Sequence, residues 1–135
     1  ISSLLMLTFA VSLPVATAAE AESVFACAFD ESAGLKWDSG TWKASAFPTK
    51  KSFFLRTLDG RLTEASINAM TRGNAVCNHY GAVYPLETCV SILGDAISFQ
   101  SSNMVGAYLD FVGSSTSDKK FKEPVFVSPF SCQKI

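Results

Sequence analysis

The sequence lacks the short motifs on which most enzyme sites are built. It has a single histidine, His79, and contains neither a Gly-x-Ser-x-Gly segment nor a glycine-rich phosphate loop. A serine-type hydrolase would therefore depend entirely on that one imidazole. Histidine-rich metal motifs are also absent. We expect no catalytic residue, no metal site and no cofactor, and a domain that binds a ligand or partner without transforming it.

The sequence also lacks an excess of charge of either sign. The chain has 11 Lys and Arg against 12 Asp and Glu, a formal net charge of −1, so no basic face for nucleic acid is predicted. The one basic cluster, formed by Lys119, Lys120 and Lys122, is interrupted by Phe121 and followed by Glu123, which is typical of a solvated loop. We expect a monomer with no nucleic-acid partner.

No charged residue occurs before Glu20, and the residues before that point have the pattern of a secretory signal peptide. Residues 4–11 form a largely apolar run, and Pro14 follows it. Small residues then allow cleavage after Ala18 or after Ala21. The apolar run is shorter than the roughly 20 residues that a membrane-spanning helix needs. Cleavage is therefore the favoured interpretation over retention as an anchor.

This pattern divides the chain into a signal peptide, residues 1–21, and a single exported domain, residues 22–135, with no integral membrane span. The sequence contains no Asn-x-Ser/Thr sequon, so export would add no N-linked glycan. A bacterial envelope fits that absence better than a eukaryotic secretory route. We expect a periplasmic or extracellular location, where the domain either binds a ligand or partner or packs within an envelope assembly.

Four cysteines lie beyond the predicted cleavage site: Cys27, Cys77, Cys89 and Cys132. An even number of cysteines in an exported chain predicts disulfides. We expect Cys27–Cys132, joining the first strand to the last, and Cys77–Cys89, bracketing a short polar and aromatic loop. The alternative, a zinc site using Cys77, His79 and Cys89, has a spacing that matches no standard zinc finger.

A strand register supports the first of these disulfides. Phe25, Cys27 and Phe29 alternate along the chain, so in a strand they share one face. If Cys27 lies opposite Cys132 in an antiparallel pair, Phe29 falls opposite Phe130. One register would thus satisfy both a disulfide and an aromatic cross-strand pair.

Turn signals at residues 39–40, 59–60 and 94–95 each separate two short strand-like runs, which predicts three β-hairpins. Residues 62–71 could continue a strand, but their content of Ala, Glu, Leu and Met favours a short helix. With a strand at each end of the domain, about seven or eight strands are expected. The fold class is therefore mainly β, as a small antiparallel up-and-down barrel or a two-sheet sandwich.

Four aromatic residues are the candidates for a recognition surface. Trp37 and Trp42 flank a hairpin tip, and Tyr80 and Tyr84 lie in the segment that the second disulfide would bracket. Aromatic side chains on rigid loops bury a large area at low entropic cost. For the two tryptophans, a cross-strand pair that stabilises the hairpin is the favoured interpretation. The ligand could be a protein, a glycan or a small apolar molecule.

The alternative function is a glycan hydrolase that uses acids near the first hairpin. Asp30, Glu31 and Asp38 are close in the sequence, and paired carboxylates can hydrolyse glycosidic bonds. Such a site needs one acid in an apolar pocket with a raised pKa. Acids beside turns, however, are ordinary turn chemistry.

Overall fold

The structure, a computed structural model, describes residues 18–19, 21–48, 52–68, 71, 73–81, 85–111 and 122–135. Within these residues the chain forms ten β-strands and one short helix. In chain order they are β1 (Glu22–Phe29), β2 (Ser32–Asp38), β3 (Thr41–Phe47), β4 (Ser52–Leu58), β5 (Arg61–Leu62), α1 (Glu64–Ile67), β6 (Ala75–His79), β7 (Glu87–Ser91), β8 (Asp95–Gln100), β9 (Val105–Asp110) and β10 (Val125–Lys134).

The predicted signal peptide lies almost wholly outside the described residues, which include only positions 18, 19 and 21 of it. Among the helices that the structure describes, none is both long enough and apolar enough to cross a membrane.

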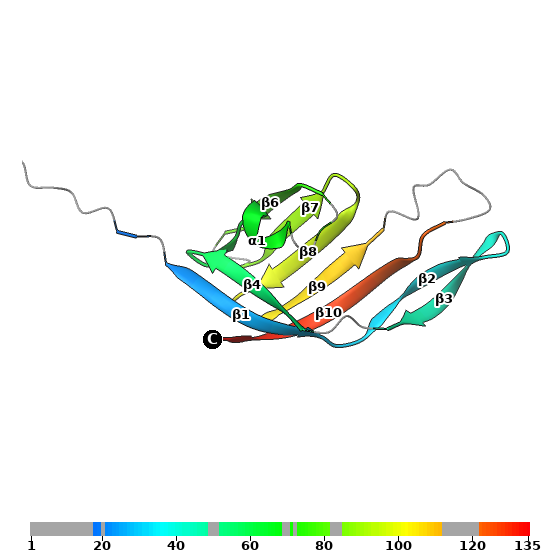
Figure 1. Ribbon diagram of the computed structural model, residues 1–135, viewed down its shortest axis with the longest axis horizontal. Helices are drawn as coiled ribbons and strands as arrows, with labels where there is room; N and C mark the ends of the chain where they lie inside the picture. Colours follow the sequence, from blue (N-terminus) through cyan, green and yellow to red (C-terminus); the bar gives the residue numbers. More distant parts are fainter. Residues whose placement is uncertain are drawn as a thin grey trace, which may run out of the picture.

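The strands form one antiparallel sheet, which is curled until it is nearly closed into a barrel (Figure 1). Its order is β5-β4-β1-β10-β9-β8-β7-β6. The short helix α1 packs against both β4 and β6, so it lies near the two ends of this order. The mainly β fold is therefore confirmed, and of the two expected architectures the sheet is barrel-like.

Strand β10 is the centre of the sheet because it pairs with three other strands. Its first part, Val125–Val127, pairs with β2, and its later part pairs with β1. On its other side it pairs with β9 along residues 126–131. The chain bends between β1 and β2, where the backbone N–H of Asp30 donates to the carbonyl oxygen of Pro129. The β2–β3 hairpin then extends away from the other strands (Figure 1).

The two disulfides join Cys27 to Cys132 and Cys77 to Cys89. Each joins residues directly opposite one another in an antiparallel pair. Phe29 also lies opposite Phe130, as the expected register requires. The second disulfide does not bracket a mere loop, however, because its cysteines lie within two paired strands, β6 and β7. The sequence pattern does not predict a strand over residues 75–79, because the polar residues there are typical of a loop. The structure accordingly has more strands than the seven or eight expected.

The core lies on the concave face of the sheet and is built from aromatic rings. Phe130 is fully buried and packs against Phe53, with ring centroids 5.1 Å apart, and against Phe99, at 6.1 Å. Opposite Phe130 stands Gly106, where an added Cβ would overlap with the Phe130 ring and with the carbonyl oxygen of Ser98. The Phe130 ring can therefore occupy this position only because residue 106 has no side chain.

The helix expected within residues 62–71 is present as a single turn. Thr63 caps it, because its hydroxyl accepts a hydrogen bond from the backbone N–H of Ser66 at 3.2 Å. Glu64 in the first turn suits the positive end of the helix. Ile67 is fully buried and fastens the turn to the core.

Candidate functional site

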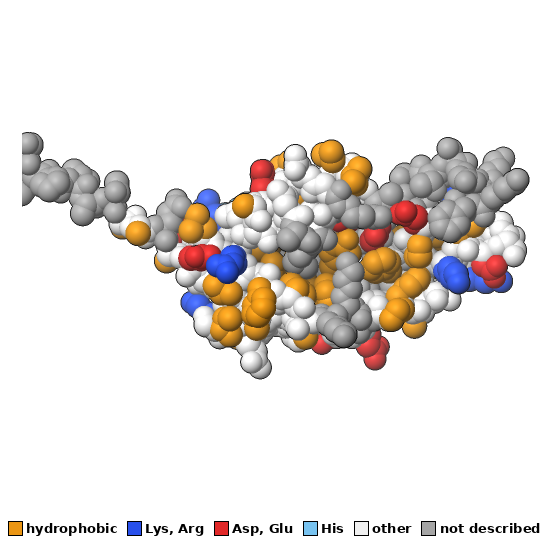
Figure 2. Space-filling view, viewed as in Figure 1, with side chains coloured by type: hydrophobic (Ala, Val, Ile, Leu, Met, Phe, Trp, Pro, Cys, Tyr) orange, Lys and Arg blue, Asp and Glu red, His pale blue; other side chains and the backbone are white. Residues whose placement is uncertain are grey.

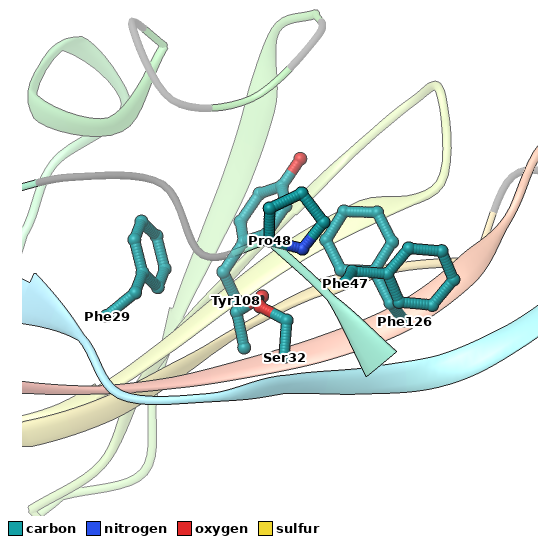
Figure 3. A pocket seen from close by; sticks show the side chains of 7 residues that line it. Phe29, Ser32, Phe47, Pro48, Tyr108 and Phe126 are labelled. Carbon is teal, nitrogen blue, oxygen red and sulfur yellow. Dashed lines mark hydrogen bonds between the residues drawn. The ribbon is translucent and has the colours of Figure 1, made fainter. Parts of the chain in front are cut away.

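A cavity of about 180 Å³ opens on the concave side of the sheet, at the bend between β1 and β2. We call it the aromatic pocket. Its lining comes from the ends of β1 and β3, the starts of β2 and β10, and the middle of β9 (Figure 3). The lining residues are Phe29, Ser32, Phe47, Pro48, Tyr108, Phe126 and Ser128. Four aromatic rings and a proline thus surround two serine hydroxyls.

Close approach of β2 and β10 creates this arrangement. Gly34 lies opposite Phe126, and a Cβ on Gly34 would overlap with the backbone of residues 125 and 126. Because that side chain is missing, the Phe126 ring can lie beside Phe47, with ring centroids 5.5 Å apart. Phe47 in turn faces Ser32 across the β2–β3 pair. The wall of the pocket therefore depends on a glycine in the neighbouring strand.

The floor of the pocket is a pair of buried hydroxyl groups. Ser32 and Ser128 are 5% and 4% exposed, and their Oγ atoms share a hydrogen bond. Two hydroxyls carry two hydrogens, and their shared bond uses one. One hydroxyl hydrogen and several lone pairs thus remain for a polar atom of a bound group. The pocket combines apolar walls with a single polar point, which is the usual chemistry of small ligand sites.

Tyr108 forms the inner wall and is held from behind. Its hydroxyl donates to Oδ2 of Asp95 at 3.1 Å, and Figure 3 shows that this hydroxyl points away from Ser32. Asp95 is fully buried and also accepts a hydrogen bond from the hydroxyl of Ser91. The Tyr108 ring is therefore presented to the pocket in a fixed position, while its polar end serves a buried carboxylate.

In the space-filling view, hydrophobic side chains gather across the middle of the face shown, and Lys and Arg side chains lie toward its two ends (Figure 2). The pocket itself is lined mostly by apolar groups, so shape and apolar contact, more than charge, would hold a group that entered it.

The aromatic residues expected to bind a ligand do not converge on the pocket. Trp37 and Trp42 are cross-strand partners with ring centroids 5.2 Å apart, and the amine of Lys122 lies 4.8 Å from the centroid of the Trp37 ring. Along β2, Trp37 is about 17 Å from Ser32. The tryptophans form the stabilising pair that the hairpin interpretation favoured.

Tyr80 is not among the residues that line the pocket. It follows β6 and is 57% exposed, and its backbone N–H donates to the carbonyl oxygen of Leu86. Tyr84 lies outside the described residues.

The three acids of the hydrolase alternative are all exposed. Glu31 precedes β2 and Asp38 ends it, so these two residues are about 23 Å apart along the strand. Glycosidase carboxylates are about 5–10 Å apart. The hydrogen bond from Lys43, at 2.6 Å, and a second from Ser39 lower the pKa of Asp38, the opposite of what a general acid needs. These acids therefore provide no glycosidase site.

His79 has a structural partner. It lies opposite Glu87 in the β6–β7 pair, and its Nδ1 shares a hydrogen bond with the Glu87 carboxylate, which is 3% exposed. The zinc alternative is wrong because Cys77 and Cys89 form a disulfide. Within the described parts of the chain, no cluster of three or more His, Cys, Asp or Glu residues could hold a metal ion.

Sequence reasoning missed the aromatic pocket. The alternation in β1 and β10 predicted that Phe29, which lines the pocket, lies opposite Phe130. It could not show that Ser32 contacts Ser128, 96 positions away in the chain. The pocket depends on the pairing of β10 with both β1 and β2. No local sequence pattern predicts that one strand pairs with both.

Comparison with known proteins adds no homologue. No protein-family model, no curated protein and no solved structure matches this chain. The functional argument therefore rests on the geometry of the pocket.

Proposed function

We propose that this chain is an exported, non-catalytic binding domain whose aromatic pocket takes up one apolar group of its ligand. The observation that carries the proposal is the cavity of about 180 Å³ between four aromatic rings, with two buried hydroxyls at its floor. Aromatic walls that could have collapsed into a closed core instead leave an open, ligand-sized space.

The volume of the pocket limits the ligand. An engineered cavity of about 150 Å³ binds benzene, whereas pockets for drug-sized molecules are usually about 300–1,000 Å³. The aromatic pocket therefore fits a single ring or a branched aliphatic group, but not a sterol, a haem or a long acyl chain. A glycan would find few polar partners on these walls.

The floor adds a preference for a polar atom on that group. An apolar ring of about this size gains about 2–3 kcal/mol on burial, which is less than the roughly 4 kcal/mol that corresponds to a Kd of 1 mM. A hydroxyl or amide that reaches the Ser32–Ser128 pair adds about 0.5–1.5 kcal/mol. The pocket by itself is thus a weak, selective site, and a physiological ligand needs further contacts.

Export is supported by the disulfides. Both are formed, and all four cysteines are used, which suggests an oxidising compartment. The leader-like residues before Glu20 also support export, and we propose the cell envelope, with the periplasm favoured, as the location.

The test is a titration of the oxidised domain with phenol and with toluene, followed by the amide shifts in NMR spectra. We expect shifts confined to the pocket strands, dissociation constants in the millimolar range, and tighter binding of phenol. Ser128→Leu, which fills the floor, should weaken both ligands at least tenfold. Ser131→Leu, on the opposite face of the same strand, is the matched control and should bind as the wild type does. If neither compound shifts the pocket residues, the proposal is wrong.

A further inference from the structure

In the described part of the chain, β3 pairs only with β2, so no other described strand lies along its outer edge. The two strands are joined by a two-residue turn in which Ser39 and Gly40 both have positive φ angles, 50° and 89°, as in a type I′ hairpin. Asp38 and Thr41, which flank the turn, form the first hydrogen-bonded pair of the ladder.

This register determines which backbone groups face the open edge. Hydrogen-bonded and non-hydrogen-bonded pairs alternate along an antiparallel ladder. Counting from Thr41, the N–H and C=O groups of Trp42, Ala44 and Ala46 therefore point away from β2. A second extended chain could pair with these three residues without disturbing the hairpin.

The edge has few of the devices that usually block pairing. Its seven residues, Thr41–Phe47, contain no proline, and Lys43 is the one charged side chain among them. Proteins commonly protect exposed edges with prolines, bulges or charged side chains, especially lysine, and of these β3 has only Lys43. A long, nearly unprotected edge is therefore suited to strand addition.

The same edge ends at the aromatic pocket. Phe47, the last residue of β3, and Pro48, which follows it, both line the cavity (Figure 3). A chain that pairs with β3 would thus run past the pocket wall. In recognition by strand addition, backbone hydrogen bonds supply affinity, and pockets for alternate side chains supply specificity.

Two lysines on the pocket face of the β2–β3 hairpin indicate that the ligand also carries an acidic group. Lys36 and Lys43 lie directly opposite one another, an arrangement of like charges that costs stability. Lys43 is paired with Asp38 at 2.6 Å, whereas Lys36 forms no ion pair with any residue in the described ranges. Lys43 and Phe47 are four residues apart and share one strand face.

We propose that the ligand is an extended polypeptide segment that adds as a strand to the edge of β3. It inserts one aromatic or branched apolar side chain into the aromatic pocket and places an acidic side chain, four residues away, beside Lys43, where Lys36 and Lys43 together outweigh Asp38 by one positive charge. This inference rests on the proposed binding role of the pocket and names the class of molecule that binds there. The acidic residue comes four positions before the apolar residue if the added strand is parallel to β3, and four positions after it if the strand is antiparallel.

The experiment uses the disulfide-bonded domain and a synthetic peptide made in both residue orders, acetyl-Ser-Glu-Thr-Thr-Thr-Phe-Ser-amide for parallel addition and acetyl-Ser-Phe-Thr-Thr-Thr-Glu-Ser-amide for antiparallel addition, with binding followed by calorimetry and NMR. We expect the peptide in one of the two orders to bind at least tenfold more tightly than phenol, with slowed amide exchange at Trp42, Ala44 and Ala46. Replacing the peptide's Phe with Ala, or its Glu with Lys, should weaken binding at least fivefold.

Two matched protein variants test the edge itself. Ala44→Pro removes one outward N–H and should weaken the peptide at least tenfold, whereas Ala44→Val keeps that N–H and should bind as the wild type does. A peptide N-methylated at alternate residues tests the same hydrogen bonds on the unaltered protein, so the inference does not depend on the folding of the proline variant.

The outcomes separate this inference from the pocket proposal. If phenol binds and the peptide binds no more tightly than phenol, the pocket role stands and the strand-addition inference is overturned. Equal peptide binding by Ala44→Pro and Ala44→Val overturns it as well. Concentration-dependent dimers that Ala44→Pro abolishes would instead make a second copy of the chain the occupant, and would also overturn it. If neither phenol nor peptide binds, both proposals fail.

Discussion

At the scale of single residues, the buried polar side chains of this domain have specific partners. Asp95 accepts hydrogen bonds from Ser91 and Tyr108, and the buried carboxylate of Glu87 shares one with His79. Burying a polar group without a partner costs about 1–3 kcal/mol, which explains why these groups come in sets. Each set also fixes the position of a neighbour, as Asp95 does for the Tyr108 ring.

Thr57 is the exception, and it carries the first prediction. Its side chain is 1% exposed, and its Oγ1 has no hydrogen-bond partner among the residues that the structure describes. Thr57→Val replaces that hydroxyl by a methyl group of similar size and removes the cost of desolvation. We expect the free energy of unfolding to rise by about 1 kcal/mol in urea denaturation. Thr88→Val, at a half-buried position, is the control and should change it little. A loss of stability in Thr57→Val would show that the hydroxyl has a partner.

At the scale of elements, the strands differ in how firmly they are held. β10 is paired along both sides, whereas β6 is paired only with β7 among the described strands. The Cys77–Cys89 disulfide therefore reinforces an edge, and the Cys27–Cys132 disulfide reinforces the centre of the sheet. The β2–β3 hairpin has a different reinforcement, the Trp37–Trp42 pair, because a two-stranded ribbon alone is marginally stable.

The two disulfides should contribute unequally to stability. Their cysteines are 105 and 12 residues apart in sequence, and in the loop-closure model the longer loop contributes about 4–5 kcal/mol and the shorter about 3. We expect the Cys27→Ala/Cys132→Ala variant to lose more stability in urea than the Cys77→Ala/Cys89→Ala variant, with the remaining disulfide kept intact in each. The model would be contradicted if removing the edge disulfide cost as much as removing the central one.

At the scale of the whole molecule, the sequence predicts what short patterns encode. Alternation in the first and last strands predicted that Cys27 faces Cys132 and that Phe29 faces Phe130, and the Ser39-Gly40 turn placed Trp37 opposite Trp42. It did not predict the aromatic pocket, because the contact of Ser32 with Ser128 depends on how the chain bends after β1.

Strand β6 was not predicted from the sequence for a related reason. In β6 the outward side chains of Val76 and Asn78 are exposed, and the inward ones include a cysteine and a histidine. This strand is specified by its disulfide and by the pairing of His79 with Glu87, not by an apolar alternation. Disulfide and polar cross-strand partners leave no apolar period in the sequence.

An open-edged, nearly closed barrel should also exchange its amide hydrogens in a definite order. Opening free energies follow the number of paired neighbours and the burial around a strand. We expect the slowest exchange in β10 at Phe130, where β1 and β9 pair on either side, and the fastest strand exchange in β3 and β6. Hydrogen exchange followed by NMR on the disulfide-bonded domain measures this order. Adding the strand-forming peptide should slow β3 and leave β6 unchanged, because β3 joins the sheet through β2 and β10 whereas β6 is the last strand of the sheet order. Protection of β3 equal to that of β10 without any peptide would mean that its edge is already covered, and strand addition would then have no free site.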